Sequence, residues 1–202
     1  MSTYPAGGNT YSISPSGGGG LLPFAIPLNA GTGQILTFSS VTGTATFCPG
    51  GACGTPSPDG PSIGGTSLTS SGSISGVLSS SSGFLAGVFL GGSLPLAAPV
   101  SLNFADLNFL SVSPMLGQQF FIGNGFTTGA VQQQFFVPNG ATMLYFGIAD
   151  GGSFNGAPGF YDDNVGSYTA NFSITAVPEP STVALLAAGL VAMGYIRSRR
   201  RA

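Results

Sequence analysis

Residues 167–176 read SYTANFSITA and residues 142–148 read TMLYFGI, and these two stretches decide the fold. Successive side chains of a β-strand point to opposite faces, so an apolar–polar alternation is typical of a half-buried strand. Residues 167–176 alternate in this way, residues 142–148 are rich in apolar and aromatic residues, and both stretches are predicted to be strands, the clearest in the chain. In the first, the alternation predicts Tyr168, Ala170, Phe172 and Ile174 toward the core and Thr169, Asn171, Ser173 and Thr175 toward water.

Other short strand-like runs recur at intervals of about ten residues, the spacing typical of an all-β sandwich. Residues 83–90 (GFLAGVFL) predict a strand buried on both faces, and residues 34–47 predict a strand with a bulge at Gly43. Residues 104–112 fit either a strand or a helical turn. Further strands are expected at 11–13, 74–78, 120–123 and 132–137.

The pattern predicts an all-β fold, a jelly-roll-like β-sandwich over residues 31–176. A Gly/Ser-rich segment, residues 1–30, precedes the sandwich and includes a possible edge strand. Residues 48–82 form a long run of Gly, Ser, Thr and Pro, and such a run is usually either functional or disordered. Residues 177–202 form a separate tail.

Charged residues are only 5% of the chain, and their placement excludes several classes of function. Of six acidic residues and four arginines, Glu179 and all the arginines lie in the tail, which leaves five aspartates and no cation in residues 1–176. Nucleic acid is excluded as a partner, because its phosphates need Lys or Arg. The chain contains no His or Lys, so its serines have no histidine base, and we expect no catalysis.

Two cysteines, Cys48 and Cys53, flank a Pro-Gly-Gly-Ala sequence. Without histidine, a zinc site has too few ligands. If the protein is exported, an oxidising compartment favours a small-loop disulfide between them, and two free thiols are the alternative.

Three of the five domain aspartates, Asp150, Asp162 and Asp163, lie within 14 residues in the segment that joins the two clearest strands. Calcium prefers oxygen ligands from carboxylates, amides and backbone carbonyls, which this segment offers. A plain acidic turn is the alternative, since Asp, Asn and Gly are common turn residues.

The tail reads VPEPSTVALLAAGLVAMGYIRSRRRA, and its three parts follow one another directly. A Pro-Glu-Pro tripeptide is followed by an uncharged run at 183–196 and then by the arginine cluster. The run predicts a single membrane-spanning helix, with the arginines on the cytoplasmic side and the domain outside. A buried C-terminal core helix is the alternative.

In order, spacing and position, this tail resembles the PEP-CTERM sorting signal of Gram-negative bacteria, with the sorting motif at Val177, Pro178, Glu179 and Pro180. The resemblance implies recognition by an exosortase, transient anchoring in the inner membrane, and cleavage near the tripeptide. The domain would then reach the cell surface or an extracellular matrix.

Residues 132–174 resemble the C-terminal half of the calcium-dependent bacterial galactose-binding lectin family, a small jelly-roll β-sandwich. The shared features are the turn QQQFFVPNG, a strand that ends in Asp150, and the segment YDDNVGSYTANFSI. The resemblance implies calcium ligands at Asp150, Asp163 and Asn164 and a backbone carbonyl ligand at Phe160. Tyr161 and Asp162 are then expected to contact the ligand. The family's His-containing sugar loop has no counterpart here, and residues 151–159 form an insertion.

These observations favour an exported, non-catalytic, calcium-dependent carbohydrate-binding protein whose partner is an exopolysaccharide or a galactose-like glycan. A structural exopolysaccharide-matrix protein of the same fold, without a sugar site, is the alternative. Residues 1–20 lack the basic and apolar regions of a secretory signal peptide. We therefore expect the coding sequence to begin upstream of Met1; otherwise residues 1–20 are already mature sequence.

Overall fold

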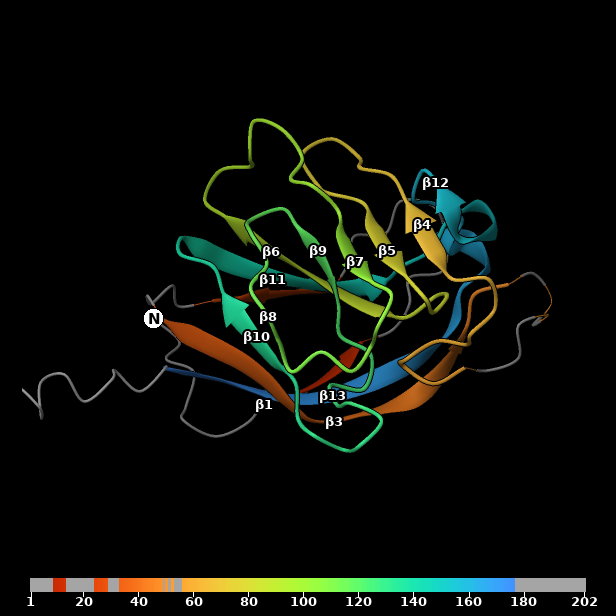
Figure 1. The fold of residues 1–202 in the computed structure, drawn as a ribbon, viewed down its shortest axis with the longest axis horizontal. Coiled ribbons are helices and arrows are strands. Elements are labelled where there is room, and N and C mark those ends of the chain that lie inside the picture. The colour runs from red at the N-terminus through yellow and green to blue at the C-terminus, as the bar shows by residue number, and fades with distance from the viewer. Residues whose placement is uncertain are drawn as a thin grey trace, which may run out of the picture.

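A computed structural model describes residues 9–13, 24–28, 33–48, 50, 52 and 56–176, and β-strands dominate it (Figure 1). One sheet has the order β1-β13-β3-β10-β8, with β1 at Asn9–Ile13, β13 at Val165–Ala176, β3 at Gln34–Thr46, β10 at Gln134–Val137 and β8 at Ser111–Val112. A second has the order β2-β11-β6-β9, at Phe24–Pro27, Ala141–Ile148, Leu85–Gly91 and Gln119–Phe121. A third has the order β12-β4-β5-β7, at Asn155–Gly156, Thr66–Leu68, Val77–Ser79 and Leu102–Phe104.

The first two sheets face each other (Figure 1). Buried apolar side chains, many of them phenylalanine, form the core between them. Phe38 on β3 is fully buried and lies in the middle of this layer. Its ring centroid is 5.8 Å from that of Phe172 on β13 and 6.1 Å from that of Phe146 on β11, across the layer. The all-β prediction is confirmed, and the core combines many phenylalanine side chains with Ile, Leu and Val.

The alternation that predicts β13 is confirmed by burial. Tyr168, Ala170 and Phe172 are buried, and Ile174 packs against the core as a partly buried side chain. The run at 83–90 is also confirmed as an interior strand, because β6 lies between β11 and β9. The segment at 104–112, which fits either a strand or a helical turn, contains the last residue of β7, a loop and the whole of the two-residue strand β8.

The predicted bulge at Gly43 is wrong in position. Strand β3 stays in register with β13 at Gly43, which pairs with Tyr168. The register shift lies four residues earlier, where Asn171 pairs with Ser40 and Phe172 with Phe38, leaving Ser39 as the extra residue. Gly43 is required for another reason: its φ is +105°, and a Cβ there would collide with the backbone oxygen of Ser167.

Gly43→Ala is therefore expected to destabilise the protein by about 1–3 kcal/mol, because alanine is strained at positive φ and its Cβ has no room. Gly92→Ala is the matched control, since no atom lies within 4 Å of a Cβ built there and its φ is not positive. Urea denaturation of both variants measures the difference. Equal stability of the two would contradict the positive φ assigned to Gly43.

Buried hydroxyl groups hold the described residues 56–82 of the Gly/Ser/Thr/Pro segment in place. Ser81 and Ser82 are buried, and their hydroxyls donate to backbone oxygens of the 59–65 loop, including that of Gly65 at 3.0 Å. Thr66 in turn donates to the backbone oxygen of Ser81 at 2.7 Å. Burying these polar side chains is tolerable because each has a hydrogen-bond partner. This part of the segment is therefore a folded part of the domain.

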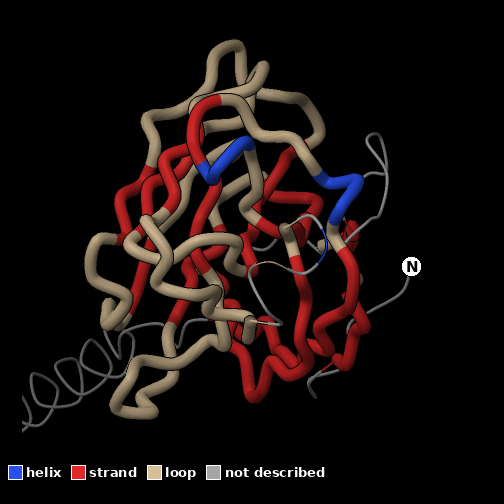
Figure 2. Tube along the Cα trace, turned by 90° about the vertical axis from the view of Figure 1, so that its right-hand side faces the viewer, coloured by secondary structure: helices blue, strands red, loops and turns tan. Residues whose placement is uncertain are grey.

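In the part of the chain that the structure describes, no helix is long and apolar enough to span a membrane. The predicted membrane-spanning helix, at 183–196, lies outside the described residues. The helical turns η2 (Gly152–Phe154) and η3 (Tyr161–Asp163) both lie in the segment between β11 and β13 (Figure 2).

Candidate functional site

The acidic segment connects the end of β11 to the start of β13, and we call residues 150–164 the acidic loop. Strand β12 and the turns η2 and η3 lie within it, so it is a folded connection. Backbone contacts close its first half: Gly151 forms a β-bridge with Pro158, and the Gly159 N–H donates to the Asp150 backbone oxygen at 3.2 Å. The loop packs on the core through Phe154, whose ring centroid lies 5.4 Å from that of Phe47.

Asp150 and Tyr161 lie close enough to interact electrostatically. Asp150 is 1% exposed, and one carboxylate oxygen accepts a hydrogen bond of 2.7 Å from the Gly151 N–H. Burial and, secondly, the negative charge of Asp150 raise the pKa of the Tyr161 hydroxyl above its usual range. The structure therefore brings a predicted metal ligand and a predicted sugar-contacting residue together.

Asp163 and Asn164 each hold a buried side-chain oxygen that accepts no hydrogen bond, at Oδ1 in both residues. The Thr46 hydroxyl is a third such oxygen. Thr46, the last residue of β3, pairs with Val165, the first residue of β13, so its backbone lies beside the end of the acidic loop. A buried polar atom without a partner costs about 1–3 kcal/mol, so the two neighbouring oxygens of Asp163 and Asn164 call for an explanation such as a bound water or ion.

Phe160 combines an exposed side chain with a left-handed backbone. It is 64% exposed, and its φ is 65°. Ser153 and Phe154 in the same loop also have positive φ, at 53° and 56°. Non-glycine residues rarely adopt this conformation, and those that do cluster at binding and catalytic sites. The ring of Phe160 lies against Gly152, where an added Cβ would be 3.1 Å from it.

The donor atoms of this loop fit calcium better than a transition metal. Among the described side chains, no group of three or more His, Cys, Asp or Glu is placed to hold a metal ion. A cation here would use one or two carboxylates together with amide, hydroxyl and backbone oxygens, a set that calcium accepts. Asp163, Asn164 and the carbonyl of Phe160 are such donors, and the Asp162 side chain lies outside the described atoms.

Sequence reasoning missed Thr46, because only the pairing of β3 with β13 brings it next to residues 163–165.

The two remaining domain aspartates have local structural roles. Asp59 is half-buried, and its Oδ1 accepts a hydrogen bond of 2.7 Å from the Asn124 N–H. Burial raises the pKa of this carboxyl, and the hydrogen bond partly opposes that effect. Asp106 is exposed and accepts a hydrogen bond of 2.8 Å from the Asn108 N–H. Neither residue belongs to the acidic loop.

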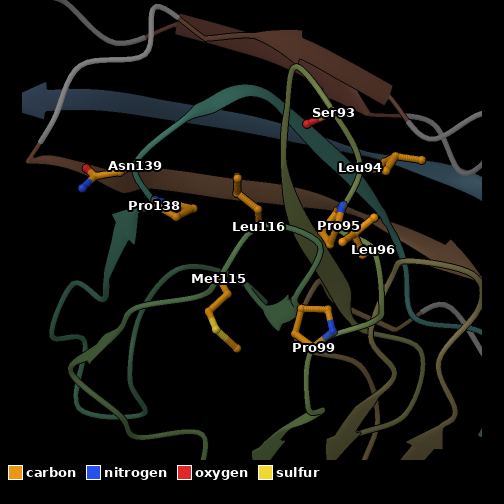
Figure 3. Close-up of a pocket in the computed structure, with 9 residues that line it drawn as sticks. All are labelled: Ser93, Leu94, Pro95, Leu96, Pro99, Met115, Leu116, Pro138 and Asn139. Carbon is orange, nitrogen blue, oxygen red and sulfur yellow. The ribbon is translucent and has the colours of Figure 1, made fainter.

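A shallow groove of about 630 Å³ lies at the other end of the sandwich from the acidic loop. Three loops line it, as Figure 3 shows, and none of its lining side chains is charged. Three of them are highly exposed for apolar side chains: Leu94 at 61%, Leu96 at 107% and Met115 at 52%. The remaining lining residues are Ser93, Pro95, Pro99, Leu116, Pro138 and Asn139.

Several predicted residues are not placed. Val177, Pro178, Glu179 and Pro180 of the sorting motif lie outside the described residues, as does Cys53. Cys48 follows β3 and packs against the core as a partly buried side chain. The Cys48–Cys53 disulfide stays a prediction.

The comparisons with known proteins concern the tail. A family model described as the PEP-CTERM protein-sorting motif matches residues 176–201. The match confirms the resemblance seen in the tail and indicates export by way of a C-terminal membrane-anchored signal, with an exosortase as the processing partner. No curated protein and no solved structure matches the chain, so neither comparison supports the resemblance to the galactose-binding lectins.

Proposed function

We propose that this chain is a surface or extracellular-matrix protein whose domain binds a carbohydrate through calcium and catalyses no reaction. The sorting motif at 176–201 supports the delivery route. On this route the tail holds the precursor in the inner membrane until an exosortase cleaves near Pro178-Glu179-Pro180, and the domain is then released outside the cell. Export also supports the Cys48–Cys53 disulfide, because thiols oxidise there.

The observation that carries the binding proposal is the pair of buried, unpartnered oxygens at Asp163 and Asn164. Residues 1–176 contain no Lys, Arg or His, so the sequence of the domain offers no cationic side chain to compensate the carboxylates. A divalent cation from solution is a partner that supplies the missing charge. Asp150 and the Phe160 carbonyl would complete the ligand set, within the jelly-roll-like sandwich that the sequence predicts.

The surface of the acidic loop supports a sugar rather than a protein as the ligand. Phe160 has an exposed ring and Tyr161 a partly buried one, and both precede Asp163 and Asn164 in the acidic loop. Aromatic rings offer an apolar face to the C–H groups of a sugar, while a cation binds its hydroxyls. Asp162 is the third proposed contact, and an exopolysaccharide or a galactose-like glycan is the proposed partner.

A glycan array tests this function directly. The protein is expected to bind glycans in calcium and to lose that binding in EDTA. Asp163→Asn is expected to bind no glycan even in calcium. Asp106→Asn, on an exposed loop elsewhere, is expected to bind glycans as the wild type does. Absence of glycan binding in both conditions contradicts the carbohydrate proposal and favours the structural matrix protein, in which calcium only stabilises the fold.

A further inference from the structure

The domain has two chemically different ends, defined by the course of β11 and β13. Strand β11 runs from Ala141, next to the groove, to Ile148, next to the acidic loop. Eight residues of strand separate the two ends by about 25 Å. Strand β13 begins at Val165, directly after the acidic loop, and ends at Ala176. Three of the five domain aspartates therefore lie at one end, and an uncharged apolar groove lies at the other.

The chain leaves the domain at the groove end. Ala176, the last residue of β13, pairs with Gln34 on β3, and Gln34 pairs on its other side with Val137. Val137 directly precedes Pro138 and Asn139, which line the groove. Ala176 and Val137 are thus two strand spacings apart, about 10 Å.

The link between the domain and the apolar part of the tail is short. Residues 177–182 separate Ala176 from the uncharged run that begins at Val183. Six residues span at most about 20 Å when fully extended. If the run lies in a bilayer, the end of the domain that carries Ala176 is held close to the lipid surface.

The exposed side chains of the groove are apolar, as contact with a lipid surface requires. Leu94 and Leu96 lie on one loop and Met115 on another (Figure 3). All three side chains are more than half exposed. Exposed apolar groups gain free energy when they enter the interfacial region of a membrane. The opposite placement of the acidic loop also fits, because the anionic lipids of a bacterial membrane repel carboxylates.

We infer that, in the membrane-anchored precursor, the groove end of the domain docks on the lipid bilayer through Leu94, Leu96 and Met115. This inference rests on the proposed anchoring by the tail. Docking holds the acidic loop away from the membrane, so its proposed ligand site faces outward. It also keeps the Pro-Glu-Pro motif at the lipid surface, where a membrane protease acts. Release by cleavage removes the anchor and frees the groove.

The chain contains no Trp, so single tryptophans report on individual positions. The full chain is reconstituted in vesicles of phosphatidylethanolamine and phosphatidylglycerol, with and without brominated acyl chains that quench tryptophan fluorescence. Leu94→Trp probes the groove. Val165→Trp is the matched control at the acidic end, because Val165 is 65% exposed and Leu94 is 61% exposed. Leu190→Trp, in the middle of the apolar run, probes the anchor itself.

The expected result is strong quenching by brominated lipid at positions 94 and 190 and little quenching at position 165. Adding Leu96→Asp and Met115→Asp to Leu94→Trp is expected to abolish the quenching at 94 while the tail stays inserted. Quenching at 190 without quenching at 94 overturns the docking and leaves the anchoring intact. A blue-shifted but unquenched Trp at 94 also overturns it, since a protein segment would then cover the groove. No quenching at 190 refutes the anchoring and the docking together.

Discussion

Replacing Pro178, Glu179 and Pro180 with alanine is expected to leave the whole protein uncleaved in the inner membrane, with no released form. These residues lie directly before an apolar run that ends in arginines, within the segment that matches the sorting motif. Without the tripeptide the exosortase has no recognition site, while the run still inserts because its apolar residues are unchanged. Immunoblots of membrane and surface fractions, with mass spectrometry of the released form, measure the effect.

The control is the double variant Ser181→Ala with Thr182→Ala, which alters the two residues after the motif and is expected to be processed normally. Wild-type released protein is expected to lack the arginines at 197–201. A released form whose mass includes those arginines contradicts processing at the motif.

Phe38→Ala is expected to destabilise the domain by about 3–5 kcal/mol, the range for truncating a buried phenylalanine. Phe38 is fully buried and contacts three other rings: Phe135 at 5.7 Å, Phe146 at 6.1 Å and Phe172 at 5.8 Å between centroids. Its loss leaves a cavity between the two facing sheets, where close-packed neighbours collapse only in part. Denaturant unfolding followed by circular dichroism measures the change.

Leu96→Ala is the control for that experiment, because Leu96 is fully exposed and its truncation is expected to change stability by less than about 0.5 kcal/mol. A cost for Phe38→Ala as small as that of the control would contradict the aromatic layer between the sheets.

The local sequence pattern was sufficient to predict the strands that contribute most of the core residues. Strand β13 alternates apolar and polar residues, and β11 and β6 are short, largely apolar runs bounded by turn residues, patterns that favour strands. Strand β2 was missed because it is four residues long and ends in Pro27, which weakens the strand pattern. The bulge was misplaced because a glycine within a strand can indicate either a bulge or a residue with positive φ. Gly43 has a positive φ and stays in register with β13.

Features that depend on tertiary contact were not predictable. The hydroxyls of Ser81 and Ser82 hold the 59–65 loop, yet in the sequence they belong to a uniform Ser/Gly run. The groove is assembled from three loops that are far apart in the sequence. Within the candidate site, the acidic residues were visible as a cluster, whereas the position of Thr46 beside them follows only from strand register.

The central claim is that the acidic loop binds calcium, and thermal unfolding of the full chain in calcium and in EDTA tests it most directly. Binding to the native state at a hundredfold excess over Kd adds about 2.7 kcal/mol, which raises the melting temperature by about 5–10 °C for a domain of this size. Asp163→Asn is expected to lose the rise, because it removes the charge and keeps the shape, while Asp106→Asn is expected to keep it. A wild-type melting temperature that is the same in calcium and in EDTA would contradict the account.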